Sequence, residues 1–225
     1  GLTRALLGAG ARKVVAVEND LRCIEALREL VQTFSGRLRV LADNALTLDE
    51  ARYVPDGSKI VANLPYNISS ALLLKWLQTP RRWNSMTLMF QKEVAQRLAA
   101  SPGGRDYGRL SVITQWVCTT KTLFDVAPGS FVPAPKVTST VISVVPRPEG
   151  PIAPAQREYL EKILVSAFGQ RRKMLRTSLK TTGVRAEEIL ELAGVSPTAR
   201  AEEIDILEFC SLARAYQGLV GHRNS

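Results

Sequence analysis

The sequence has few of the residues that build metal sites and disulfide frameworks. Its 225 residues include three cysteines and one histidine, His222. Cys23, Cys118 and Cys210 are far apart, and none has a C-x-x-C partner or a histidine nearby. Such spacing argues against a zinc site and against paired cysteines. We therefore expect no bound metal and reduced thiols, as in a cytoplasmic protein.

Long apolar runs and aromatic residues are also scarce. No run approaches the roughly 18 apolar residues that a membrane span needs, and no basic-then-apolar signal segment is present. These absences predict a cytoplasmic protein that does not enter a membrane. Aromatic residues make up only 6% of the chain, so an aromatic side chain in a loop or turn is a candidate for a specific role.

Positive charge is in excess. The chain has 30 lysines and arginines against 21 acidic residues, which gives a net charge of +9 and an isoelectric point near 9.8. An excess of this size raises encounter rates with polyanions and displaces counterions from phosphates. Because many basic proteins bind no nucleic acid, the charge alone favours such a partner only modestly.

The first two thirds of the chain alternate between strand-like and helix-like patterns. Apolar β-branched runs predict strands at 13–17, 38–41, 59–62, 86–90, 123–126 and 137–145. Helical spacing predicts helices at 2–7, 21–33, 71–77, 91–99 and 110–117. The glycine-rich stretch 101–108 is expected to be a flexible loop. This alternation predicts an α/β fold with an open, mostly parallel, Rossmann-like sheet.

A proline-rich segment separates this part from a purely helical one. Pro146–Pro151 has the composition of a linker, and only helical patterns follow it, at 157–168, 173–179, 186–192 and 201–216. We therefore predict two domains: an α/β domain over 1–148 and a small all-helical domain over 152–225.

Several polar residues stand where predicted strands end. Glu18, Asp43, Asn44 and Asn63 each close or follow an apolar run. Ligands of open α/β sheets bind beyond the carboxyl ends of the strands. One crevice could therefore gather these four side chains.

The segment that begins at Asn63 suits methylation of an exocyclic amine. The amine nitrogen of adenine shares its lone pair with the ring, which makes it a poor nucleophile. The carboxamide oxygen of Asn63 and the backbone carbonyl of Leu64 could accept its two hydrogens and localise that lone pair. Pro65 would stiffen the bend, and Tyr66 offers a π-face to the base. Taken alone, the segment would equally suit a plain strand-end turn with a buried tyrosine.

The Asn63 segment does not stand alone, and the motifs of the chain together favour methylation of an amine over a plain turn. They are NLPYNIS at 63–69, QKEVAQRL at 91–98, YGRLSV at 107–112, FVPAPKVTS at 131–139 and FGQRRKMLRTSL at 168–179. With these motifs the chain resembles the small-subunit ribosomal RNA adenine dimethyltransferase family, over nearly every segment from 1 to 179. The resemblance implies a Rossmann-like, S-adenosylmethionine-dependent methyltransferase that dimethylates two adjacent adenosines near the 3′ end of 16S rRNA. It also implies a role in small-subunit biogenesis and the small ribosomal subunit as partner, and we expect a monomer.

The resemblance assigns a cofactor role to a set of residues near the predicted strand ends. Glu18 would accept the ribose hydroxyls of the cofactor, and Asn19 would flank its adenine ring. The family usually has Asp-Ala-Leu after the next strand, where this chain has Asp43-Asn44-Ala45-Leu46. Either Asp43 or Asn44 could accept from the adenine amine. The full predicted cofactor set is Gly1, Leu2, Glu18, Asn19, Asp43, Asn44 and Asn63.

Catalytic and RNA-binding roles follow from the same resemblance. Phe131 matches the aromatic residue that stacks on the flipped target adenine, and stacking of a base on an aromatic ring is worth roughly 1–3 kcal/mol. The predicted catalytic set is Asn63, Leu64, Pro65, Tyr66 and Phe131. The predicted RNA-binding set is Arg105, Arg109, Lys136, Arg171, Arg172, Lys173 and Arg176, which makes 152–225 an RNA-binding domain.

The beginning of the sequence departs from the family pattern. Gly1 matches the last glycine of a Gly-rich cofactor loop, so we expect a first strand and most of that loop to lie upstream. Two alternative functions remain. One is the related antibiotic-resistance dimethylation of large-subunit rRNA, against which YGRLSV and the 171–179 run argue. The other is a ribosome-assembly factor that binds pre-subunits without methylating them.

Overall fold

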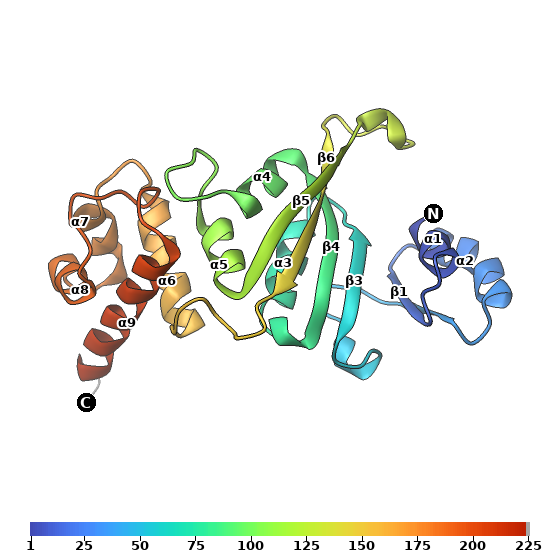
Figure 1. Ribbon diagram of the computed structural model, residues 1–225, viewed down its shortest axis with the longest axis horizontal. Coiled ribbons are helices and arrows are strands. Elements are labelled where there is room, and N and C mark those ends of the chain that lie inside the picture. The colour runs from blue at the N-terminus through green and yellow to red at the C-terminus, as the bar shows by residue number, and fades with distance from the viewer. Residues whose placement is uncertain (224–225) are drawn as a thin grey trace. The chain divides into compact units, whose positions relative to one another are not determined.

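The structure is a computed structural model that describes residues 1–223 (Figure 1). By its contacts the chain forms two compact units, Gly1–Leu88 and Met89–Ser225. The division predicted from the sequence, between 148 and 152, rests on composition and stays a prediction. Among residues 1–223, no helix has the length and apolar character to cross a membrane. The same residues contain no cluster of metal-ligating side chains.

The first unit alternates helices and strands as the sequence predicts. Its elements are α1 (Leu2–Gly8), β1 (Val14–Glu18), α2 (Leu21–Thr33), β2 (Leu38–Ala42), the 3-10 turn η1 (Glu50–Arg52), β3 (Ser58–Asn63), α3 (Ser69–Trp76) and η2 (Pro80–Arg82). Strand β4 (Trp83–Gln91) runs across the boundary between the units.

Strands β1 and β2 are parallel and form a sheet of their own. Their register pairs Val14 with Leu38 and Glu18 with Ala42. Helix α2 begins at an acidic cap, because Asp20 accepts a hydrogen bond from the backbone N–H of Arg22. Leu7, Leu30 and Leu38 form the core of this region, with helix and strand residues packed around them.

The other strands form a second sheet in the order β3-β4-β6-β5. The predicted α/β class is therefore confirmed, whereas the expected single open sheet is found as two sheets. Among the described residues, β1 has no strand partner on its second edge. Within residues 1–223, no strand joins the β1–β2 pair to the second sheet by backbone hydrogen bonds.

The second unit combines a strand pair with helices. It contains α4 (Lys92–Ala99), α5 (Arg109–Val117), β5 (Cys118–Val126), η3 (Pro128–Ser130), β6 (Ser139–Pro146), α6 (Arg157–Gly169), α7 (Leu175–Ser178), η4 (Leu179–Thr182), α8 (Ala186–Ala193) and α9 (Ile206–Arg223). Strands β5 and β6 are antiparallel, from Cys118 opposite Pro146 to Val126 opposite Ser139. Strand β5 starts earlier than predicted, because the threonine-rich stretch after Cys118 continues the ladder.

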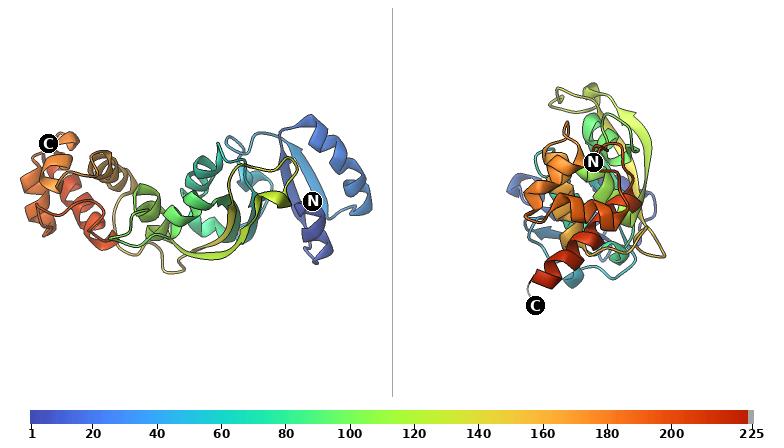
Figure 2. Two further views of the ribbon diagram at one scale, coloured as in Figure 1. Left: turned by 90° about the horizontal axis from the view of Figure 1, so that it is seen from above. Right: turned by 90° about the vertical axis from the view of Figure 1, so that its left-hand side faces the viewer.

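Helices α6 to α9 pack together, as both views in Figure 2 show. Aromatic rings form part of their core: Phe168 stacks on Phe209 with ring centroids 5.5 Å apart. The predicted helix at 201–216 is wrong in its start, since α9 begins at Ile206. A capping box fixes that start, because Asp205 accepts from the N–H of Glu208 and Glu208 accepts from the N–H of Asp205.

The glycine-rich loop at 101–108, which the sequence predicts to be flexible, is anchored at two positions. The side chain of Tyr107 is fully buried, and its ring meets Phe168 edge-on at 6.1 Å. The N–H of Gly103 donates to the backbone carbonyl of Glu202 at 2.7 Å. The loop is therefore packed against the helices of the same unit.

Candidate active site

The carboxyl ends of β1 and β2 bring two acidic residues together. The N–H of Asp43 donates to the backbone carbonyl of Glu18 at 3.1 Å, so the parallel pairing continues one residue past β2. The Glu18 carboxylate uses one oxygen, Oε1, to accept from the N–H groups of Asn19 and Asp20, at 2.8 and 2.9 Å. Its other oxygen accepts no hydrogen bond within residues 1–223. Glu18 is thus held in place and keeps one acceptor for a ligand.

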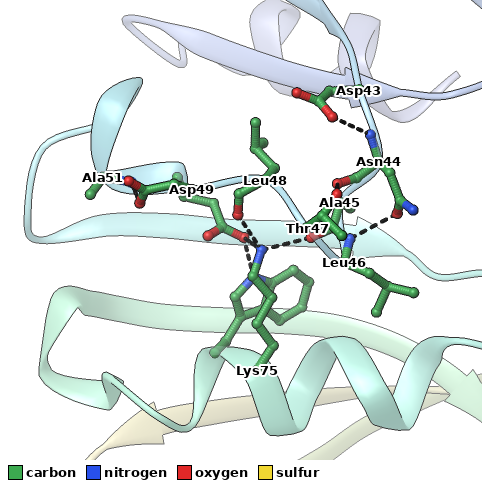
Figure 3. A network of polar contacts seen from close by, with 11 residues as sticks. Asp43, Asn44, Ala45, Leu46, Thr47, Leu48, Asp49, Ala51 and Lys75 are labelled. Carbon is green, nitrogen blue, oxygen red and sulfur yellow. Dashed lines mark hydrogen bonds and ion pairs between the residues drawn. The ribbon is translucent and has the colours of Figure 1, made fainter.

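The turn after β2 gives Asp43 and Asn44 different hydrogen-bonding capacity (Figure 3). Asp43 accepts from the N–H of Asn44 with Oδ1, at 2.7 Å, and keeps Oδ2. Asn44 uses its only side-chain oxygen to accept from the N–H of Leu46, at 3.0 Å. Its carboxamide N–H₂ remains, and that group is a donor. Asp43 therefore has the better remaining acceptor.

The spare oxygens of Glu18 and Asp43 fit the donors of an adenosine-type cofactor. Ribose hydroxyls and an adenine amine each donate hydrogen bonds, and both carboxylates present an uncommitted acceptor at one sheet edge. Asn19 is exposed beside Glu18. Gly1 caps α1 and Leu2 opens it, and both are exposed. A Cβ atom at Gly1 would meet no other atom of the described residues within 4 Å, so the structure itself does not require a glycine there.

The segment from Asn63 to Tyr66 forms a fixed turn between β3 and α3. The side chain of Leu64 is buried, whereas Asn63 and Pro65 are exposed on either side of it. The N–H of Ile68 donates to the carbonyl of Pro65 at 3.1 Å, and the hydroxyl of Ser69 donates to the carbonyl of Tyr66 at 3.0 Å. The turn is therefore braced on both sides of Tyr66.

Two acceptors in this turn are unused. Neither the carboxamide of Asn63 nor the carbonyl oxygen of Leu64 makes a hydrogen bond within the described part of the chain. Both lie on consecutive residues at the end of β3, which is the arrangement that the sequence predicts for holding an exocyclic amine. Tyr66 is half-buried.

Phe131 lies on a loop of the second unit, between β5 and β6. It follows the turn Pro128–Ser130, and its N–H donates to the carbonyl of Pro128 at 3.2 Å. Its side chain is half-buried, and Lys136 on the same loop is exposed. Because Asn63 and Phe131 belong to different units, their meeting at one target base stays a prediction.

Basic residues line a pocket of about 390 Å³ in the second unit. Its lining includes Arg97, Arg105, Arg109 and Arg171, together with the first turn of α5. The Arg105 side chain is 92% exposed. The predicted RNA-binding residues Arg105, Arg109 and Arg171 are thus brought to one surface.

Arg171 is engaged within the protein, unlike its neighbours. Its guanidinium donates to the carbonyls of Gly104 and Arg105, at 3.3 and 2.7 Å, and lies 3.4 Å from the Glu202 carboxylate. It therefore ties the 101–108 loop to the helical region. Three predicted residues on the same segment are exposed and make no side-chain hydrogen bond or ion pair within residues 1–223: Arg172, Lys173 and Arg176.

Two further basic residues, Lys92 and Arg82, are also engaged within the protein. Lys92 donates to Asp125 at 2.6 Å, and this contact lowers the pKa of the Asp125 carboxyl. Arg82 pairs with Asp56 at 2.8 Å and donates to the carbonyl of Val54. Both side chains support structure, so their charge is only partly available to an anion.

Burial argues against a cysteine nucleophile. It raises the pKa of Cys118 to about 12 and that of Cys210 to about 11. Both thiols are therefore protonated near neutral pH. Cys23 is exposed in the first turn of α2.

Sequence reasoning missed Lys75 and Glu50. Lys75 donates to Ala45, Leu48 and Glu50 around the turn that carries Asp43 and Asn44 (Figure 3). No motif points to this pair, because the two residues are 25 positions apart and each reads as an ordinary surface charge. A lysine in an otherwise apolar helix segment, Leu72–Leu77, was the only available signal.

The comparisons with known proteins give the family of the chain. The family model for ribosomal RNA adenine dimethylase matches residues 1–218. The chain is 54% identical to ribosomal RNA small subunit methyltransferase A of Paramagnetospirillum magneticum, covering all of this chain and 80% of that protein. It is also 54% identical to the enzyme of the same name from Rhodospirillum rubrum, covering 96% of this chain and 74% of that protein.

Solved structures give the same fold. A dimethyladenosine transferase from Plasmodium falciparum matches with a TM-score of 0.78 at 23% identity, over 92% of this chain and 82% of that one. The 23S rRNA methyltransferase ErmE matches with a TM-score of 0.68 at 26% identity, over 96% of this chain and 87% of that one. The chain therefore belongs to the ribosomal RNA adenine dimethylase family and has the fold of its methyltransferases.

Proposed function

We propose that the protein transfers methyl groups from S-adenosylmethionine to N6 of two adjacent adenosines near the 3′ end of small-subunit rRNA. The reaction would take place on the small ribosomal subunit in the cytoplasm, during its biogenesis, with the protein acting as a monomer. The observation that carries the proposal is the pair of unused acceptors on Asn63 and Leu64, in a turn braced by Pro65, Tyr66 and Ser69.

The chemistry of this turn matches the needs of an aromatic amine. The Asn63 carboxamide oxygen and the Leu64 carbonyl each accept one amine hydrogen, which turns the nitrogen lone pair away from the ring. Tyr66 offers its ring to the base, and the resemblance to the family assigns Phe131 as a second stacking residue. Because the acceptors are neutral and fixed, the residues act by positioning and oriented dipoles, and no strong base is required.

S-adenosylmethionine, when bound, supplies an electrophilic methyl group next to this turn. Glu18 holds the ribose hydroxyls with its spare oxygen, and Asn19 flanks the adenine ring. We assign the adenine amine to Asp43 rather than Asn44, since the oxygen of Asn44 already accepts from Leu46. Gly1 and Leu2, at the start of α1, and Asn63 complete the set.

RNA contacts divide between two surfaces. Arg105 and Arg109 at the basic pocket, and Lys136 on the Phe131 loop, bind RNA phosphates. Arg172, Lys173 and Arg176 in the helical region bind further RNA phosphates, since all three are exposed. Arg171 lines the pocket, but its main role is to hold the 101–108 loop.

Large-subunit rRNA is the second candidate substrate. The likeness to ErmE speaks for it, at 26% identity. Small-subunit enzymes are 54% identical over nearly the whole chain, which favours the small subunit.

The experiment that tests the proposal combines labelled S-adenosylmethionine with purified, unmethylated subunits. We expect label in small-subunit adenosines and none in large subunits. Asn63→Ala should reduce the rate by about 10²-fold or more, the usual cost of a lost preorganised acceptor or donor, with subunit binding nearly unchanged. Asn84→Ala, an exposed asparagine on β4, is the matched control and should keep the wild-type rate.

Two outcomes would contradict this assignment. If label appears in large subunits alone, the substrate is large-subunit rRNA. Equal loss of binding and transfer in Asn63→Ala would mean that the residue supports the fold instead of the reaction.

Charge removal tests the helical RNA surface. Replacing Arg172 and Lys173 by alanine should weaken subunit binding and lower the slope of log K against log salt by about 0.7–0.9 for each lost phosphate contact. Filter binding over a salt series measures both effects. The matched control replaces Arg12 and Lys13, an exposed adjacent pair in the first unit. A slope that changes equally in both double variants would rule out a specific RNA surface on the helices.

A further inference from the structure

We propose that Lys75 is a positioning residue for the cofactor site, which rests on the function proposed above. Its ammonium group holds the loop Asp43–Asp49, called here the Asp43 loop, in the shape that presents Asp43 to the adenine of the cofactor. Lys75 lies near the end of α3, and all the residues involved belong to the first unit.

Lys75 uses all of its hydrogen-bonding capacity on this loop and on Glu50, which follows the loop. An ammonium group has three hydrogens, and three acceptors surround it: the carbonyl of Ala45 at 2.7 Å, the carbonyl of Leu48, and Oε1 of Glu50 at 2.8 Å. The side chains of Lys75 and Glu50 are 24% and 21% exposed. A charge so shielded from water and so fully coordinated is fixed in position.

Glu50 is fixed by a second donor. Its Oε1 also accepts from the indole N–H of Trp76 at 2.8 Å, and Trp76 is 7% exposed. Consecutive residues of α3 therefore hold one carboxylate, immediately after the Asp43 loop. The acid is anchored to the core through the tryptophan, and Lys75 connects this acid to the loop carbonyls of Ala45 and Leu48.

The loop cannot hold its shape by internal contacts alone. Asn44 orders the first half, because its carbonyl accepts from the N–H groups of Thr47 and Leu48 and its side chain accepts from Leu46. The carbonyls of Ala45 and Leu48 have no other partner in the described chain, and the Leu48 side chain is buried. Without Lys75 these carbonyls would need water or a different loop shape.

Helix α3 thereby connects the two halves of the proposed site. Its first residue, Ser69, braces the turn that carries Asn63 and Tyr66. Its next-to-last residue, Lys75, braces the turn that carries Asp43. The distance between the two turns is set in part by the length of one helix.

The test uses Lys75→Met, which keeps an unbranched side chain as far as the ε position and removes the ammonium group. We expect the Kd for S-adenosylhomocysteine, measured by calorimetry, to rise about tenfold, the equivalent of one lost positioning hydrogen bond. The KM for S-adenosylmethionine should rise by the same factor, with kcat on small subunits changed by less than about threefold. Amide exchange at Leu46, Thr47 and Leu48 should accelerate in the ligand-free protein.

An inosine analogue of the product makes the test specific for the adenine end. In S-inosylhomocysteine a carbonyl replaces the adenine amine, so the wild type should prefer S-adenosylhomocysteine. Lys75→Met should lose most of that preference. A purely structural role would lower the free energy of unfolding and weaken both ligands equally.

Three further variants complete the design. Lys59→Met, on an exposed lysine of β3, is the matched control and should bind as the wild type does. Lys75→Arg keeps the charge and should recover part of the affinity. Glu50→Gln keeps an acceptor for Lys75 and Trp76, so it should fold and show a smaller rise in Kd, even if Lys75→Met is unstable.

The outcomes separate this inference from the proposed function. If the wild type binds neither S-adenosylmethionine nor its product, the proposed function fails. If the wild type binds and folded Lys75→Met or Glu50→Gln retains both affinity and adenine preference, Lys75 does not position the loop.

Discussion

The region around Glu18 and the helical region after Gln156 bury their apolar side chains to different extents. In residues 1–42 only Leu7, Leu30 and Leu38 are buried, and every residue of β1 is half-buried. The helical region buries a continuous set that includes Leu160, Phe209 and residues from all of its helices. The first region carries the predicted cofactor acids, and the second carries the exposed arginines and lysine.

This difference shows two ways of supporting a functional surface. The helical region rests on apolar burial, which contributes roughly 25 cal/mol for each Å² removed from water. The Glu18 and Asp43 end rests largely on hydrogen bonds to backbone groups, from Asn44, from Lys75 and from the β1–β2 pairing. Such bonds fix geometry but each contributes only about 1 kcal/mol net.

The largest expected effect is on the helical core. Phe209→Ala removes a fully buried ring that stacks on Phe168, so the free energy of unfolding should fall by about 3–5 kcal/mol. Leu30→Ala, in the smaller core, should cost about 2 kcal/mol, the low end for a leucine truncation. Urea unfolding followed by circular dichroism measures both.

Leu207→Ala serves as the control, since this leucine is half-exposed on the same helix as Phe209. Its cost should stay within about 0.5 kcal/mol. Amide exchange adds the regional information: Leu30→Ala should speed exchange in α2 and β2 without affecting α9. An equal cost for Leu30→Ala and Phe209→Ala would remove the contrast between the two cores.

The smallest expected effect is the acid dependence of α2. The side chain and N–H of Arg22 donate to Asp20 and lower its pKa from 3.8 to about 2. The ionised cap therefore stabilises the fold above pH 3.8, and this contribution is lost as the pH falls from 3.8 to about 2.

Carbon-13 chemical shifts of the Asp20 carboxyl should report that titration directly. Asp20→Asn keeps a good capping side chain and should remove this part of the acid sensitivity of α2. A carboxyl that titrates at its ordinary value would show that the contact with Arg22 does not persist in solution. The first region would then be less ordered than the hydrogen bonds indicate.

Much of the fold could be predicted from local sequence. The helix at 21–33 and the strands ending at Glu18 and Asn63 follow from apolar periodicity and from the polar residues after them. The start of α9 at Ile206 could also have been predicted from the sequence, because Asp205 and Glu208 have the spacing of a capping box. The prediction failed there because helical apolar spacing continues through the turn that precedes the cap.

The candidate site was predictable only where one segment carries it. The turn from Asn63 to Tyr66 is local, so its residue types already indicate its chemistry. Lys75 and Arg171 could not be identified in this way, since each acts on a loop that is 25 to 67 residues away. Arg171 was predicted to bind RNA from its place in a basic run, yet its guanidinium is engaged by carbonyls.

The sequence by itself determined the α/β class, the polar residues at the strand ends, the family and the excess of positive charge. These properties depend on residue type and short-range spacing. Tertiary structure decided which charges are committed inside the protein and which remain for a ligand. The sequence does not distinguish a lysine or arginine that is hydrated from one that donates to carbonyl oxygens. Those acceptors come from distant segments, so only the folded structure determines the hydrogen-bond partners.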